Sequence, residues 1–234
     1  MTNTSLSQVI VALDFPSEKE ALHFLDKVEG KLTYVKVGMQ LYYSQGPELI
    51  EKIKAKDLKI FLDLKLHDIP ATVAKASQVL AKLKIDMVNV HAAGGFEMMK
   101  KANQAYKEIH PEGKMIAVTQ LTSTSQEVLN QEIGISGKLS DNVLHYAKMA
   151  KEAGLDGVVC SAWEAEFIKE KMGETFLCVT PGIRLNLENA HDQKRVKTPA
   201  QAIKAGADFL VMGREITKAS NPKEIVNSIE KDLI

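Results

Sequence analysis

Short apolar runs alternate with longer amphipathic stretches along the chain. Eight runs rich in aliphatic and β-branched residues predict strands at positions 9–13, 34–38, 59–66, 87–92, 115–121, 157–162, 176–180 and 209–213. The stretches between them carry apolar residues at helical spacing and predict helices at 17–28, 47–56, 70–83, 96–108, 140–153, 163–172, 199–205 and 222–232. Near-continuous apolar strands are typical of a parallel sheet covered by helices. The pattern therefore predicts an α/β protein.

Signals at the helix ends support these boundaries. Ser17 stands three residues before Glu20, the spacing of a capping box, and four helices are predicted to begin at a proline, namely Pro47, Pro70, Pro199 and Pro222. A weak repeat, Ala-Gly-Leu-Asp at 153–156 and Ala-Gly-Ala-Asp at 205–208, ends a helix and leads into a strand each time. Glycine at that place suits the left-handed residue that follows many helices.

The number of strand–helix units and the chain length together indicate the architecture. Eight units in 234 residues match a single-domain (β/α)8 TIM barrel, which we expect to occupy residues 8–234 behind a short polar tail at 1–7. A doubly wound open sheet is the structural alternative, but neither a GxGxxG turn nor a Walker A sequence occurs. In a barrel, functional residues are expected where the strands end at their carboxyl face.

Composition narrows the range of functions. The chain has 30 basic and 30 acidic side chains and is 45% hydrophobic, so no global field attracts nucleic acid or anionic lipid. No apolar run is long enough to cross a membrane, and the start of the chain lacks a secretory pattern, so we expect a cytoplasmic protein. Cys160 and Cys178 form no metal-binding or redox motif and are interpreted as buried small hydrophobic residues.

Charged residues cluster at the predicted carboxyl end of the third strand. Asp63 and Lys65 are two positions apart, so strand alternation directs both toward the barrel interior. Burying such a pair is costly unless it is compensated or functional, and an ion pair that merely plugs the barrel is the alternative. Asp68 lies just before the next predicted helix, where an acidic residue is also favoured for its effect on the helix.

Two neighbouring strands add charges to the same mouth. Lys36 ends the second strand and points inward by the same alternation, while Asp14 closes the first strand and could alternatively be a solvated turn residue. The alternating array of Lys36, Asp63, Lys65 and Asp68 is nearly neutral overall and presents a fixed field to a substrate.

The opposite side of the predicted mouth has an anion-binding character. Arg184 closes the seventh strand, and Gly213 and Arg214 close the eighth and begin a short helical turn. Barrels often bind phosphate at these two strands, and an arginine contributes a planar fork for two oxygens. The polar stretch at 185–198, which contains Gln193, is expected to be a lid over phosphate.

The remaining polar candidates give weaker signals. Thr119 and Thr122 follow the fifth strand and could offer hydroxyl groups to a ligand, although threonine is common at such positions. His67, His91 and His191 show no metal-binding spacing and are expected to form hydrogen bonds or to lie in loops. A lysine between two aspartates already supplies positive charge, so no metal is expected.

These motifs together resemble the orotidine 5'-phosphate decarboxylase family over essentially the full chain. The segment Asp63-Leu-Lys65-Leu-His-Asp68-Ile-Pro is more specific than the DxKxxD pattern within it, which a wider group of barrels shares. The other matching segments, in chain order, are Val-Ala-Leu-Asp14, Val-Lys36-Val-Gly, Val-Thr-Gln-Leu-Thr122-Ser, Thr-Pro-Gly-Ile-Arg184 and Val-Met-Gly-Arg214-Glu-Ile.

The resemblance implies a cofactor-independent decarboxylation of orotidine 5'-phosphate to UMP by a homodimer. Lys65 would protonate C6 of the pyrimidine as carbon dioxide leaves, and Asp63 would face the departing carboxylate. By the same resemblance, Lys36 and Asp14 would bind the ribose hydroxyls, and Asp68 would reach into the active site of the other subunit. Thr122 would contact the pyrimidine, and the phosphate would be held by Gln193, Arg184 and Arg214.

Three other readings fit parts of the pattern. A sugar-phosphate decarboxylase or aldolase of the 3-keto-gulonate or hexulose phosphate type would share Asp63 and Lys65 but normally needs magnesium. A phosphate-ligand sensor would keep Arg214 without needing the charged array. A purely structural array would predict that Lys65→Met leaves stability unchanged or raised and removes no function.

Overall fold

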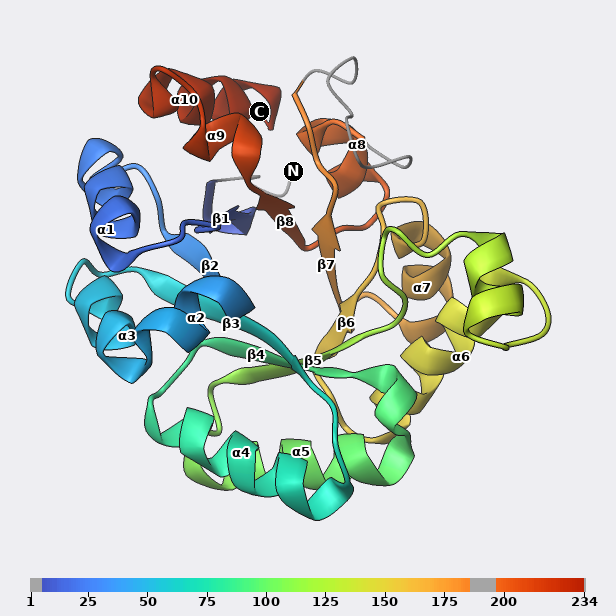
Figure 1. Cartoon of the computed structure of the whole chain (residues 1–234). Helices are drawn as coiled ribbons and strands as arrows, with labels where there is room; N and C mark the ends of the chain where they lie inside the picture. Colours follow the sequence, from blue (N-terminus) through green and yellow to red (C-terminus); the bar gives the residue numbers. More distant parts are fainter. Residues whose placement is uncertain (1–5, 186–196, 234) are drawn as a thin grey trace.

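Eight parallel strands close into a barrel in chain order, with β8 paired to β1 (Figure 1). The structure is a computed structural model that describes residues 6–185 and 197–233. The strands are β1 (Val9–Ala12), β2 (Tyr34–Gly38), β3 (Lys59–Leu66), β4 (Met87–His91), β5 (Lys114–Val118), β6 (Gly157–Val159), β7 (Leu177–Pro181) and β8 (Phe209–Met212). The predicted (β/α)8 barrel is confirmed.

Helices surround the barrel (Figure 1). They are α1 (Glu18–Lys27), α2 (Met39–Gln45), α3 (Pro47–Lys54), α4 (Pro70–Lys82), α5 (Phe96–Ile109), α6 (Leu139–Glu152), α7 (Ala165–Met172), α8 (Pro199–Lys204), α9 (Arg214–Thr217) and α10 (Pro222–Asp232). The segments Leu6–Gln8 and Ala92–Gly94 form single 3-10 turns, and Val128–Glu132 forms a π-helical turn. Within the described ranges, no helix has the length and apolar character needed to span a bilayer.

The structure has one helix that the sequence pattern did not predict, and two strands that end three residues earlier than predicted. Helix α2 was not predicted, because it has seven residues and buries only Leu41, which gives no usable periodicity. Strands β5 and β6 end at Val118 and Val159, before the predicted ends at 121 and 162. Past that point the backbone N–H and the hydroxyl of Thr119 both donate to the Val159 carbonyl, at 3.3 and 2.9 Å, so a side chain adds a second bond between the two strand ends.

The signals predicted at the helix ends are present in the structure. The Ser17 hydroxyl accepts a hydrogen bond from the N–H of Glu20 at 3.3 Å, and the four prolines occupy the first turns of α3, α4, α8 and α10. Gly154, after α6, has a φ of +82°, and Gly206, after α8, has a φ of +93°. Lys84 holds the equivalent place after α4 with φ +50°, a conformation that costs a residue with a Cβ more than it costs glycine.

Apolar side chains form two separate shells. The inner shell fills the barrel and includes Ile10, Phe61 and Met87, while the larger outer shell packs the strands against the helices. Cys160 and Cys178 are buried free thiols in the outer shell, as predicted. Because the inward face of each strand alternates with the outward face, the inner shell is the floor beneath the residues at the mouth.

Three aspartates tie strands together at the amino-terminal end of the barrel, and we call them the aspartate caps. The carboxylates of Asp86, Asp156 and Asp208 accept the backbone N–H groups of Ile60, Met115 and Cys178 at 2.9, 2.7 and 2.7 Å. Each cap stands directly before an even-numbered strand and binds the preceding odd-numbered strand. This explains the aspartate that ends both copies of the sequence repeat.

Replacing the Asp208 cap is expected to destabilise the barrel strongly. Its carboxylate also lies 2.8 Å from the ammonium of Lys169, whose side chain is only 6% exposed. Asp208→Ala leaves that ammonium and the Cys178 N–H without this partner, so the free energy of unfolding should fall by about 3 to 5 kcal/mol. Urea denaturation measures the change.

The exposed pair of Lys148 and Glu152, whose charged atoms are 3.9 Å apart, provides the control. Glu152→Ala should change the free energy of unfolding by less than about 1 kcal/mol. An equal, small effect of Asp208→Ala and Glu152→Ala would show that the cap does not stabilise the strand ends.

Candidate active site

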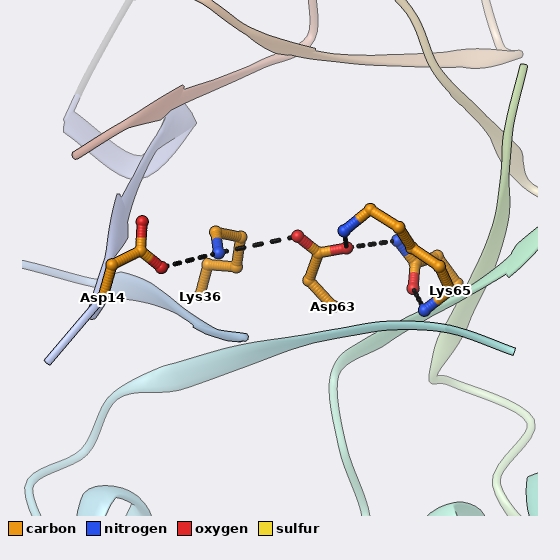
Figure 2. A network of polar contacts seen from close by, with 5 residues as sticks. Asp14, Lys36, Asp63 and Lys65 are labelled. Atoms are coloured by element: carbon orange, nitrogen blue, oxygen red, sulfur yellow. Dashed lines mark hydrogen bonds and ion pairs between the residues drawn. The ribbon is translucent and has the colours of Figure 1, made fainter. Parts of the chain in front are cut away.

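Four of the predicted residues form one chain of charges at the carboxyl ends of β1, β2 and β3. The Lys36 ammonium lies 3.1 Å from Asp14 Oδ1 and 3.5 Å from Asp63 Oδ2. The Lys65 ammonium lies 2.6 Å from Asp63 Oδ1. Figure 2 shows the four side chains in a row, with Asp63 between the two lysines. The structure therefore brings together Lys36, Asp63 and Lys65 of the predicted array, with Asp14 at one end.

Asp63 is held as a buried anion. Its side chain is 14% exposed, and burial alone would raise its pKa. The nearby ammonium groups of Lys36 and Lys65, together with hydrogen bonds from Lys65 and Asn89, outweigh burial and lower the pKa of Asp63 below its ordinary value. The site therefore fixes a negative charge between two positive ones.

The backbone at Lys65 is not a regular strand. Lys65 has φ +54°, in the left-handed region that residues with a Cβ rarely adopt. The pairing of β3 with β4 shifts here, since Leu62 pairs with Val88 but Leu66 pairs with Val90. Simple alternation predicted that Lys65 faces the mouth, but the strand reaches that arrangement through an irregularity.

Asn89 on β4 is a residue of this site that the sequence analysis missed. It is 1% exposed, its side-chain oxygen accepts the Lys65 N–H at 2.8 Å, and its side-chain NH2 donates to Asp63 at 2.7 Å. The signal was a polar residue at an inward position of an otherwise apolar strand, Met-Val-Asn-Val-His.

Asp68 lies apart from this chain of charges. It is exposed just before α4, and its carboxylate accepts the N–H of Ile69 at 2.6 Å. In the part of the chain that the structure describes, no ion pair joins Asp68 to Lys36 or Lys65. Its predicted role in the site of a second subunit stays a prediction.

A cavity of about 250 Å³ adjoins the charged residues. Asp63, Lys65 and Thr122 line it, together with apolar residues of the inner shell such as Phe61 and Val211. Thr119 is fully buried and donates its hydroxyl to β6, so it does not offer that proton to a ligand. A polar end and an apolar wall suit a small molecule with both polar and apolar parts.

The two arginine segments lie together on the other side of the mouth. The carboxylate of Glu215 accepts the N–H of Leu185 at 3.0 Å, which links the loop after Arg184 to α9, where Arg214 is the first residue. A Cβ atom at Gly213 would lie 3.8 Å from Asp14, so this segment adjoins the chain of charges. Gln193 lies outside the described residues.

Two histidines lie beside the lysine at the end of β3. The rings of His67 and His91 stack 5.6 Å apart, and His91 Nδ1 accepts the N–H of Ala93. Burial, His67 and Lys65 lower the pKa of His91, so it is neutral near pH 7. Its hydrogen-bonding role agrees with the sequence prediction, while His191 lies outside the described residues. Among the residues that the structure describes, no group of three or more His, Cys, Asp or Glu side chains is arranged to bind a metal ion.

The structure is a (β/α)8 barrel with fixed charges and a cavity at its carboxyl mouth. This is the arrangement of the barrel enzymes, whose active sites lie at that mouth. Comparison with known proteins identifies the family. The description "Orotidine 5'-phosphate decarboxylase / HUMPS family" applies to the family model that matches residues 7–229. The chain belongs to this family and is an enzyme of the carboxy-lyase class.

Individual relatives agree with this assignment. A protein from Bacillus cytotoxicus named orotidine 5'-phosphate decarboxylase is 53% identical over 227 residues, which cover 95% of each chain. The crystal structure of orotidine 5'-phosphate decarboxylase from Lactobacillus acidophilus matches with a TM-score of 0.87 and 41% identity, covering 97% of this chain and 99% of that one. A structure from Geobacillus kaustophilus, described as an uncharacterized conserved protein, matches with a TM-score of 0.85 and 45% identity, covering 97% of this chain and 100% of that one.

The lowered pKa of Asp63 predicts how this residue affects stability in acid. A carboxyl group whose pKa is lower in the folded state stabilises the fold fully above its unfolded pKa, and this contribution is lost as the pH falls through the folded pKa. Asp63→Asn removes this proton uptake. In urea denaturation at a series of pH values, the variant's free energy of unfolding should fall less steeply than that of the wild type below the ordinary aspartate pKa. Above it the two curves should run parallel, and identical slopes in acid would contradict the prediction.

Proposed function

We propose that this chain catalyses the decarboxylation of orotidine 5'-phosphate to UMP in de novo pyrimidine biosynthesis, without a metal or organic cofactor. The observation that carries the proposal is the buried Asp63 carboxylate held between the ammonium groups of Lys36 and Lys65. The names of the relatives support the same substrate. The setting expected for this pathway is the cytoplasm.

The reaction needs charge stabilisation rather than an electron sink. When the bond between C6 and its carboxylate breaks, carbon dioxide leaves and the electron pair stays on C6 in the plane of the ring, where the π system cannot delocalise it. An ammonium group beside C6 stabilises that charge and then donates its proton to C6. Lys65 is the residue proposed for both roles, and solvent returns its proton after product release.

Asp63 contributes in two ways in this proposal. It holds the Lys65 ammonium 2.6 Å from its own oxygen, so the proton donor is positioned before the substrate arrives. It also faces the substrate carboxylate, a repulsive contact that is relieved when neutral carbon dioxide departs. The low pKa of Asp63 keeps it charged at neutral pH for both purposes.

The rest of the substrate has binding groups on three sides. Lys36 and Asp14 are proposed to bind the ribose hydroxyls, and Thr122 in the cavity wall is proposed to contact the pyrimidine. Arg184, Gly213 and Arg214 are proposed to bind the phosphate, because Glu215 links their two segments. Gln193 is predicted to join them. Binding energy from the non-reacting phosphate then supports the chemical step.

A homodimer is part of the proposal, with Asp68 reaching the active site of the partner subunit. Within its own chain Asp68 is exposed and separate from the charged row, and the neighbouring Ile69 is 67% exposed. A large exposed apolar side chain beside a predicted catalytic carboxylate fits a surface that a second copy covers. Sites formed by two subunits follow naturally from a two-fold interface.

The principal test is to treat the protein with EDTA, add orotidine 5'-phosphate and follow the change in pyrimidine absorbance. The wild type should turn over, whereas Lys65→Ala should lose turnover and still bind the nucleotide, because only the proton donor is removed. A folded Lys65→Ala variant with substantial activity would refute the role of Lys65. A requirement for added magnesium would instead favour the sugar-phosphate decarboxylases or aldolases.

The role of Arg214 is tested by comparing the phosphorylated substrate with the bare nucleoside. Losing a charge-assisted contact to phosphate should weaken transition-state binding of orotidine 5'-phosphate by about 2 to 5 kcal/mol. Arg214→Ala should therefore lower kcat/KM for the nucleotide far more than for orotidine. Lys218→Ala, which removes an exposed cation at the end of α9, is the control and should leave the ratio unchanged. Equal losses on both substrates would place Arg214 elsewhere.

Shared active sites predict complementation between two inactive variants. Lys65→Ala and Asp68→Ala homodimers should both be severely impaired, because every site lacks one group. In a mixed dimer one site carries both lesions and the other carries neither, so random reassociation should restore about a quarter of wild-type activity. The measurement is to dissociate equal amounts, let them reassociate and assay decarboxylation.

The control mixes Lys65→Ala with Asp63→Ala. These two residues pair within one chain, so each site of the mixed dimer lacks one of them and activity should not recover. If the first mixture also stays at the mean of its parents despite demonstrated subunit exchange, Asp68 serves its own chain.

A further inference from the structure

We propose that Asn89 is a positioning residue for the decarboxylation: its side-chain amide fixes both the backbone of Lys65 and the carboxylate of Asp63. The inference rests on the proposed function for its effect on catalysis. It adds a residue outside the set that the sequence motifs contain. Asn89 touches the two proposed catalytic residues and acts on the substrate only through them.

Asn89 lies opposite an irregular stretch of β3. Leu62 pairs with Val88, and the next paired residues are Leu66 and Val90, so three residues of β3 stand opposite Asn89 alone. A backbone irregularity of this size leaves ladder groups without their usual partners. The Asn89 side-chain oxygen accepts the Lys65 N–H at 2.8 Å and so replaces the missing ladder bond.

The backbone of Lys65 is held in a strained conformation. Its φ of +54° is unfavourable for a residue with a Cβ, and such conformations persist only where surrounding contacts enforce them. This conformation lets the side chains of Lys65 and Asp63 meet at 2.6 Å across the irregularity. The hydrogen bond from the Lys65 N–H to Asn89 is a contact that enforces it.

The other half of the Asn89 amide binds Asp63. The Asn89 NH2 group donates to Asp63 Oδ1 at 2.7 Å, the same oxygen that accepts from the Lys65 ammonium. The neighbours also fix the orientation of the amide, because the Lys65 N–H is a donor and the Asp63 carboxylate is an acceptor. Asn89 therefore joins the donor lysine and its aspartate in one hydrogen-bonded unit.

Few other residue types satisfy both neighbours. An apolar residue of similar size would leave the Lys65 N–H without this acceptor and would remove one of the hydrogen bonds that Asp63 accepts. A carboxylate could accept from Lys65 but would place a second negative charge against Asp63. Asparagine supplies the acceptor and the donor without a charge.

The test compares Asn89→Ala with Asn103→Ala. Like Asn89, Asn103 is a buried asparagine. Its NH2 group donates to the backbone carbonyl of Gly154, and it lies on α5 outside the charged row. Asn89→Ala should lower kcat for orotidine 5'-phosphate about 100-fold with little change in KM, because misplacement of reacting groups affects the chemical step. Asn103→Ala should lose stability and keep its kcat. A wild-type kcat in folded Asn89→Ala protein would overturn the proposal.

Asn89→Asp provides a second readout that a merely structural role would not change. The introduced carboxyl keeps the acceptor for Lys65, and the adjacent Asp63 raises its pKa. Its protonated form can donate to Asp63 again, so the activity of the variant relative to the wild type should rise as the pH falls. A constant ratio across the pH range would count against the donor role of Asn89.

A measurement without substrate separates this inference from the proposed function. Hydrogen exchange followed by NMR should show faster exchange of the Lys65 amide in Asn89→Ala than in the wild type or Asn103→Ala, relative to Leu64. An unchanged Lys65 amide would overturn the positioning role even if the wild type decarboxylates orotidine 5'-phosphate. Faster exchange in a protein that does not turn over this substrate would refute the proposed function and leave the backbone role supported.

Discussion

The burial of the Asp63 carboxylate between two ammonium groups is the constraint on which the site depends. A lone buried carboxylate would be neutralised by a raised pKa, and a lone buried ammonium would lose its proton more readily. Here each charge stabilises the next, so the barrel keeps ionised groups above an apolar floor. Such an arrangement stabilises the fold little in itself, because desolvation offsets much of the attraction. Its value is a field that is already oriented before a substrate binds.

The rest of the mouth is organised around this constraint. Lys36 reaches both Asp14 and Asp63, so the end of β1 is tied to the end of β3 through the residue between them. Gly38 leaves room for that contact, since a Cβ there would lie 3.1 Å from the Lys36 ammonium. Charged groups therefore determine which small residues the surrounding strand ends can carry. The inner apolar shell below them needs only shape and volume.

The sequence predicted the architecture and most of the charged row, because strand alternation and the (β/α)8 count are regular. It failed where the backbone is irregular. The left-handed conformation of Lys65 and the bond from its N–H to Asn89 depend on a shift between β3 and β4, which no local pattern encodes. Asp68 illustrates a different limit, since its predicted partner belongs to a second chain. Side-chain periodicity thus identified which residues meet, while their exact geometry required the pairing of distant strands.

The aspartate caps at the opposite end of the barrel have a consequence for how the molecule opens. Each cap joins one odd-numbered strand to the even-numbered strand after it, which groups β3 with β4, β5 with β6 and β7 with β8. The closed sheet is therefore not uniform around its circumference. Within each of these pairs, the two strands are joined by a side-chain hydrogen bond in addition to the backbone ladder. Native-state fluctuations should then separate the barrel into two-strand cooperative units. The bulged lysine and its asparagine lie within one such pair, β3 with β4, so the Asp86 cap at the far end of the same seam joins the two strands that carry them.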